Sequence, residues 1–183
     1  MATIKSVNKA YLGDASPTPK DPNLYVFRVD DVKTFPTRDS NGIKSTDNLV
    51  LNDNAKGIGI YINPSTMSRV DAPDGEYPSV GYICTVAGTA PGDALMLNEI
   101  VQALTNKDLI LITKGCESDA ATRLHGAKCA PLSLSVEETD SNEATEKVLT
   151  FTQTNRYRYK SIHYGGTIPD LEEYATLEEQ EGI

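Results

Sequence analysis

The sequence contains no tryptophan, three phenylalanines and two histidines among its 183 residues, whereas it has nine tyrosines. A chain that is rich in tyrosine and poor in phenylalanine suits hydrated surfaces and interfaces better than a large dry core. No stretch approaches the roughly 18 apolar residues of a membrane span, and the amino terminus lacks the apolar run of about 7–15 residues that a signal peptide needs. We therefore expect no membrane partner and a product that stays in the cytoplasm where it is made.

Positive charge is also scarce. There are 17 Lys and Arg residues against 26 Asp and Glu residues, which gives a net charge of −9. This balance argues against a protein whose main task is to bind nucleic acid. Six of the acidic residues lie in 170–183, where there is no Lys or Arg. From the length we predict one β-rich domain over 1–169, beginning with an arm and loop at 1–23, followed by an acidic extension at 170–183.

The cysteines and histidines form no recognisable catalytic or metal-binding motif. Cys84, Cys116 and Cys129 do not have CxxC spacing, and we expect three reduced, partly buried thiols. His125 precedes Cys129 by four residues, but in a strand these positions are about 13 Å apart. A thiolate–imidazole pair is therefore not expected.

Two further patterns fall short of a binding site. The Gly57-x-Gly59 pattern lacks the additional glycines and the following helix of a phosphate-binding loop. Within a strand over 57–62 these glycines instead predict a close backbone approach or a bend. The acidic segments 39–42 and 140–146 lack the ligand spacing of a calcium loop. We predict that the protein is not an enzyme and has no catalytic residue, cofactor or metal.

The hydrophobic pattern predicts one helix among many strands. Apolar residues recur at i, i+3, i+4 and i+7 from Leu97 to Leu104, and Asp93 can cap the helix start, so we predict a packed helix over about 93–106. Segments rich in β-branched and aromatic residues predict strands at 24–32, 57–62, 80–88, 108–114, 123–129, 132–138 and 147–164. Apolar and polar residues alternate over 132–138, and we expect this strand to form a hairpin with 147–154. The segment 63–78 is expected to be a long polar connection. The expected fold is mainly β, an antiparallel β-barrel or sandwich with one packed helix and long assembly loops and arms.

The most unusual segment is NRYRYKSIHY, residues 155–164. In a strand it would place its cations on one face and its aromatic residues on the other. The cations are Arg156, Arg158 and Lys160, and the opposite face holds Tyr157, Tyr159 and Ser161. Such a face could form a subunit interface, pair with charges on a neighbouring strand, or bind single-stranded nucleic acid by stacking. We favour the subunit interface, because the surrounding chain is acidic.

The second half of the chain resembles the tail tube (major tail) proteins of long-tailed bacteriophages and related phage-like injection systems. The resemblance lies in LHGAKCAPLSLSVEE and NEATEKVLTFTQ, with a small-residue turn at Gly126, a strand entry at Pro131–Leu132, an Asp/Asn-rich loop at 140–142 and Leu149–Thr150–Phe151. The opening MATIKSVNKAY is also similar to such proteins.

This resemblance implies a structural virion protein in the phage tail, made in the cytoplasm of a bacterial host. Its protomers would form stacked hexameric rings around a hollow tube, through which DNA passes without specific binding. Its partners would be other copies of itself and other tail proteins. The alternative is a β-sandwich binding module or another virion component, such as a decoration or head–tail joining protein.

Contacts between protomers are expected from the arm, from the basic segment and from the acidic extension. We expect Arg156, Arg158 and Lys160 to meet the acidic extension at 170–183, within a protomer or between neighbours. Polar loops longer than about 12–15 residues are uncommon in compact monomers, so the loop at 37–56 is expected to contact neighbours too. The expected interface residues are Ile4, Val7, Tyr11, Arg156, Tyr157, Arg158, Tyr159, Lys160, Glu172 and Glu173.

Overall fold

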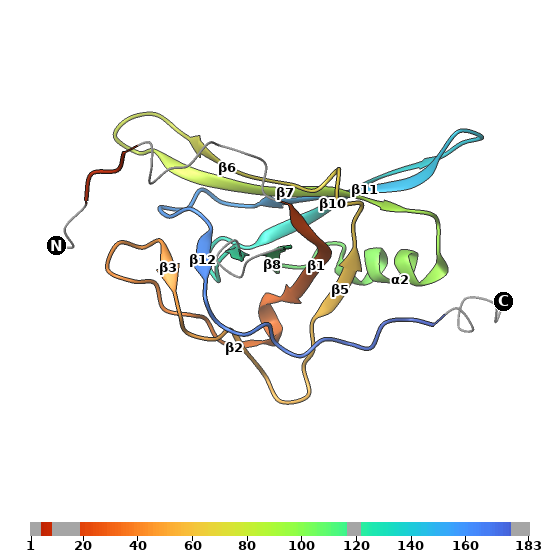
Figure 1. Ribbon diagram of the computed structural model, residues 1–183, viewed down its shortest axis with the longest axis horizontal. Coiled ribbons are helices and arrows are strands. Elements are labelled where there is room, and N and C mark those ends of the chain that lie inside the picture. Colours follow the sequence, from red (N-terminus) through yellow and green to blue (C-terminus); the bar gives the residue numbers. More distant parts are fainter. Residues whose placement is uncertain (1–4, 9–18, 117–121, 177–183) are drawn as a thin grey trace.

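The computed structural model describes residues 5–8, 19–116 and 122–176 (Figure 1). The fold is mainly β, a sandwich with one α-helix, α2 (Leu95–Leu104), and a short 3-10 helix, η1 (Val29–Asp31). The strands are β1 (Lys20–Arg28), β2 (Val32–Thr34), β3 (Lys44–Ser45), β4 (Val50–Leu51), β5 (Ile58–Tyr61), β6 (Ser68–Asp74), β7 (Gly81–Pro91), β8 (Leu109–Gly115), β9 (Arg123–His125), β10 (Leu132–Asp140), β11 (Thr145–Gln153) and β12 (Ile162–Tyr164).

One ten-stranded sheet folds into the two layers of the sandwich. The first layer has the order β6-β7-β11-β10, and the second has the order β5-β1-β8-β9-β12-β3. The layers are joined where Leu132 of β10 pairs with Leu109 of β8. All pairs are antiparallel except β3 with β12, so the sheet is mixed. The predicted hairpin of 132–138 with 147–154 is confirmed as β10–β11, whose far end projects beyond α2 (Figure 1).

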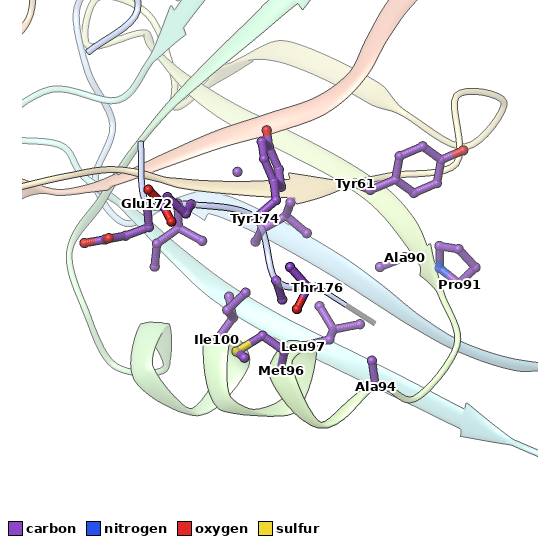
Figure 2. Close-up of a pocket in the computed structure, with 15 residues that line it drawn as sticks. Tyr61, Ala90, Pro91, Ala94, Met96, Leu97, Ile100, Glu172, Tyr174 and Thr176 are labelled. Carbon is purple, nitrogen blue, oxygen red and sulfur yellow. The ribbon is translucent and has the colours of Figure 1, made fainter. Parts of the chain in front are cut away.

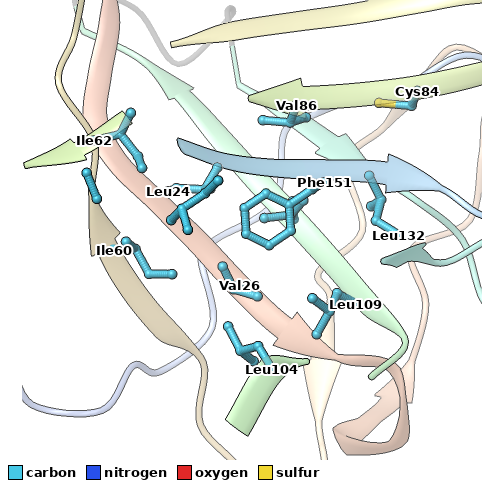
Figure 3. Close-up of a cluster of buried hydrophobic side chains, with 13 residues drawn as sticks. Leu24, Val26, Ile60, Ile62, Cys84, Val86, Leu104, Leu109, Leu132 and Phe151 are labelled. Carbon is cyan, nitrogen blue, oxygen red and sulfur yellow. The ribbon is translucent and has the colours of Figure 1, made fainter. Parts of the chain in front are cut away.

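β8 carries the core on both of its faces. Its burial is almost continuous, as expected for a strand that is covered on two sides and therefore reads as an apolar run. Leu109 and Leu111 point between the layers, toward residues such as Phe151 (Figure 3). Ile110 and Ile112 belong to a second cluster on the other side of β8.

The second cluster is closed by the irregular parts of the chain. Phe27, Leu124 and Tyr164 are buried in it, and Leu51 and Leu171 pack against it from the 32–51 connection and the carboxyl-terminal segment. These connections therefore have a structural role in the monomer, because they cover the second face of the sheet.

The predicted helix is confirmed, with a different start. Leu104 is 1% exposed, and Leu97, Ile100 and Val101 pack partly buried against the core between the layers. Asp93 does not cap the helix, because the cap position is Ala94 without a side-chain hydrogen bond. Asp93 Oδ1 instead accepts hydrogen bonds from Asn98 Nδ2 (2.7 Å) and Lys147 Nζ (2.7 Å). It thereby ties the helix start to β11.

The segment 63–78, expected to be a polar connection, contains β6. The prediction of one continuous strand over 147–164 is wrong. β11 ends at Gln153, and the chain returns as the short β12 only at Ile162. Where the strand breaks, Gln153 Nε2 donates to the carbonyls of Asn155 (2.6 Å) and Tyr82 (3.3 Å), which turns the chain away from the strand direction. The predicted strand at 123–129 likewise ends early, at His125.

The residues that follow β12 lie along β5. Gly57 N donates to Asp170 O and Glu172 N donates to Gly57 O, both at 2.8 Å. A Cβ at Gly57 would lie 2.3 Å from Cε1 of Phe27, and one at Gly59 would lie 2.5 Å from Oη of Tyr174. The close approach that the glycines of 57–62 predicted is therefore confirmed. We call residues 170–176 the carboxyl-terminal strap.

Truncating the helix side chains tests this packing. Leu104→Ala should lower the free energy of unfolding by about 2–5 kcal/mol, because it leaves a cavity at a site with almost no exposure. Ile100→Ala should cost less, because Ile100 is only partly buried. Urea unfolding measures both variants. Equal stability of Leu104→Ala and the native chain would contradict the placement of α2.

Candidate functional site

The segment between β11 and β12, residues 154–161, is the strongest candidate for a contact surface, and we call it the basic loop. Arg156, Arg158 and Lys160 are exposed on it, whereas Tyr157 and Tyr159 are half-buried. The cations are thus more exposed than the tyrosines, but the segment is a loop and not the strand on whose opposite faces they were expected.

Arg38 holds the two tyrosines in place. Its guanidinium lies 5.6 Å from the ring centroid of Tyr157 and 5.0 Å from that of Tyr159, within the range of cation–π attraction. Its Nη1 donates to the carbonyl of Gly42 (2.7 Å) and to that of Lys160 (3.0 Å). Sequence reasoning missed Arg38, because it lies in a polar loop more than a hundred residues away from Tyr157 and Tyr159.

Tyr82 of β7 supports the middle of the loop. Its backbone exchanges two hydrogen bonds with that of Tyr157, with N–O distances of 2.7 and 3.0 Å. Lys160 Nζ lies 5.0 Å from the centroid of the Tyr82 ring. Arg158 lies over the ring of Tyr159 at 5.5 Å. The loop is thus fixed in conformation along its length, and its cations are presented from a rigid base.

A buried polar cluster anchors the end of the loop. Ser161 Oγ donates to Asp71 Oδ1 (2.6 Å) and lies 2.9 Å from His125 Nδ1. Since the serine proton goes to the carboxylate, His125 donates from Nδ1, and its Nε2 accepts from Thr113 Oγ1 at 2.8 Å. Cys84 Sγ lies 3.2 Å from the same Nδ1. The thiol beside His125 is therefore Cys84, and Cys129 is exposed.

This cluster has the residue types of a catalytic triad in an unsuitable order. Ser161 lies between Asp71 and His125, so its proton is held by the carboxylate and the imidazole does not take it. Burial lowers the pKa of His125 to about 3, with Asp71 opposing and the cations of Arg69 and Arg123 adding to the shift. Burial likewise raises the pKa of Cys84 to about 12. At neutral pH both groups are uncharged, and they hold the basic loop against the sheet.

The other expected interface residues lie elsewhere. Val7 is 57% exposed, whereas Ile4 and Tyr11 lie outside the described residues. Glu172 Oε2 pairs with Lys56 Nζ at 3.4 Å. Arg156 Nε lies 3.5 Å from Asp74 Oδ2. Within the described part of a single chain, no ion pair joins the basic loop to the strap. Cys116 is exposed like Cys129, so only Cys84 of the three thiols is buried.

An apolar groove runs beneath the strap (Figure 2). Its volume is about 570 Å³, and its walls come from β5, α2, the end of β7 and residues 172–176. Ile58, Ile60 and Leu97 make its floor apolar, and Tyr174 lies over β5 at its edge (Figure 2). The groove could take an apolar side chain or a small ligand, and it is the second candidate site.

In residues 5–8, 19–116 and 122–176, no group of three or more His, Cys, Asp or Glu side chains could hold a metal ion. No helix in the same ranges is long and apolar enough to cross a membrane. Comparison of the chain with known protein families, characterised proteins and solved structures finds no match.

The buried histidine predicts loss of stability in acid. The folded-state pKa of about 3 lies below the ordinary value of 6.5, so the unfolded chain binds the proton first as the pH falls below 6.5. The contribution of neutral His125 to the free energy of unfolding should be fully present above that pH, and the free energy of unfolding should fall by about 2 kcal/mol between pH 7.5 and 5. Urea unfolding at both pH values measures the loss. His125→Asn should remove most of the pH dependence, whereas His163→Asn, which changes the exposed histidine, should keep it. Equal pH dependence in both variants would contradict this assignment.

The seat of the strap can be tested at Gly59. A valine there would overlap the ring of Tyr174, and overpacking of this kind costs about 1–3 kcal/mol. Gly59→Val should therefore destabilise the protein and open the strap to carboxypeptidase. In a Tyr174→Ala background the same substitution should cost less, because the overlapping ring is gone. Additive costs in the double variant would show that Tyr174 does not sit over Gly59.

Proposed function

We propose that this chain is a structural virion subunit whose copies form stacked hexameric rings and build the hollow tail tube of a long-tailed bacteriophage or a related injection system. The resemblance of residues 124–138 and 142–153 to tail tube proteins raised this function, and a sandwich with one packed helix is compatible with it. In this role the protein acts in the virion tail beside other tail proteins, and no catalytic chemistry is assigned to it.

The observation that carries the proposal is the outer face of the β6-β7-β11-β10 layer. Side chains on this face alternate with the buried Val86, Leu149 and Phe151, so they point away from the core. Over the middle of the layer they are uncharged, and all but Ile83 are small: Val70, Ala72, Ile83, Thr85, Ala87, Thr89, Ser133, Ser135, Val148, Thr150 and Thr152.

The charges on this face are all negative. Asp74, Glu137 and Glu146 lie toward the ends of the strands, and the outward positions of these four strands include no Lys or Arg. Proteins bind DNA largely by neutralising phosphates with cations. A surface of hydroxyl and methyl groups without cations cannot neutralise DNA phosphates in this way. We therefore assign this face to the wall of the DNA channel.

The apolar groove favours a second candidate, a β-sandwich binding module or another virion component such as a decoration or head–tail joining protein. Ligand sites are commonly apolar clefts of about 300–1,000 Å³, and the groove of about 570 Å³ has this size. Such a module would not need to form rings, so the assembly state separates the two candidates.

Electron microscopy of the purified protein tests the proposal. Rings or hollow tubes are expected, and a protein that stays monomeric at all concentrations would favour the binding module. The channel wall is tested with Thr150→Lys, which adds one cation per copy to the neutral face. Tubes of this variant should retain added DNA at low salt and release it at high salt, whereas tubes of the neutral variant Thr150→Gln should not retain it. Equal retention by both would contradict the wall assignment.

A further inference from the structure

Two of the three cations of the basic loop, Arg158 and Lys160, form no ion pair within the described part of the chain. Arg158 and Lys160 are exposed and contact tyrosine rings, and none of the described carboxylates pairs with them. Arg156 has one distant pair with Asp74, in which both side chains are at least half exposed. Because Arg38, Tyr82 and Ser161 already fix the backbone, an anionic partner would meet these cations without the cost of ordering the loop.

A matching acidic surface lies at the far end of the β10–β11 hairpin. We call residues 137–146 the acidic tip. It carries five carboxylates and no Lys or Arg: Glu137, Glu138, Asp140, Glu143 and Glu146. The next cation in the chain, Lys147, is 1% exposed and already pairs with Asp93 (2.7 Å) and Glu138 (2.5 Å). It therefore leaves the other tip carboxylates uncompensated.

β11 keeps these two surfaces apart. The strand begins at the acidic tip and ends at Gln153, beside the basic loop, and Figure 1 shows the two at opposite ends of the layer. Nine residues at about 3.3 Å per residue span roughly 30 Å. The tip and the loop of one chain consequently cannot meet, whereas those of two copies placed end to end can.

We propose that the acidic tip of one copy docks on the basic loop of the next copy. This inference rests on the proposed function, and it names the surfaces through which copies of the chain join. The contact is heterologous, since each copy offers its tip to one neighbour and its loop to another, and repetition gives a ring or a stack. It also replaces the acidic extension with the hairpin tip as the partner of the basic loop.

Charge reversal tests the contact. A tip variant carries Glu137→Lys, Glu143→Lys and Glu146→Lys, and a loop variant carries Arg158→Glu and Lys160→Glu. Each alone would set like charges against each other, so the concentration needed for assembly at about 50 mM salt should rise at least tenfold. Mixed in equal amounts, the two variants should assemble again, because the basic tip fits the acidic loop and the acidic tip of the loop variant fits the unchanged loop. At 1 M salt, where screening acts over about 3 Å, the variants and the native chain should converge.

The control variant carries Asp53→Lys, Glu99→Lys and Asp108→Lys, which change the net charge as much as the tip variant does, at exposed positions outside the tip and the basic loop. It should assemble like the native chain. Thermal unfolding checks that every variant folds, and recovery on mixing cannot come from misfolded chains. Sedimentation velocity and electron microscopy measure the assemblies.

The outcomes separate this inference from the proposed function. Tubes of both reversed variants at native concentrations would overturn the contact and leave the tube intact. Short oligomers that respond to charge reversal and mixing as predicted, but never form tubes, would support the contact and overturn the proposed tail tube. A native chain that stays monomeric would overturn both. Loss of single-stranded oligonucleotide binding in the loop variant, with normal assembly, would overturn the contact and make the loop a nucleic-acid site.

Discussion

The burial of β8 on both faces is the constraint on which the other features depend. Its odd-numbered leucines form the core between the two layers, and its even-numbered isoleucines need a cover on the opposite side. That cover consists of the 32–51 connection and the segment through Leu171. Loops of this length are uncommon in a compact monomer. Here they have a structural role, because they bury the second face of β8.

The same arrangement accounts for the rigidity of the basic loop. Thr113 of β8 donates to His125 of β9, and His125 in turn contacts Ser161 at the end of the loop. Asp71 from β6 completes the cluster. A fully buried imidazole is costly to charge, so His125 is neutral at ordinary pH, and the cluster serves as an anchor. The polar cluster around His125 resembles a catalytic site in its residue types. Its role is to fix the position of the basic loop and its three cations.

Charge is distributed along the first layer in a way that follows from its topology. The hairpin turn places carboxylates at one end, the loop after β11 places cations at the other, and the strands between them show hydroxyl and methyl groups on their outer face. A chain with this polarity has one neutral side and two complementary ends. Both features suit a subunit that repeats end to end around a channel.

The sequence by itself determined the elements whose signals are local. The stripe from Leu97 to Leu104 and the alternation of 132–138 each identified an element, because side-chain periodicity reflects which face is buried. Similarly, Gly57 and Gly59 indicated a close approach of other atoms. Only the tertiary structure decided that 155–161 is a loop, because the interactions that bend it come from Arg38, Tyr82 and Asp71, each more than 70 positions away. The same holds for the pairing of His125 with Cys84 and for the strap on β5, since contacts between distant residues leave no periodic trace in the chain.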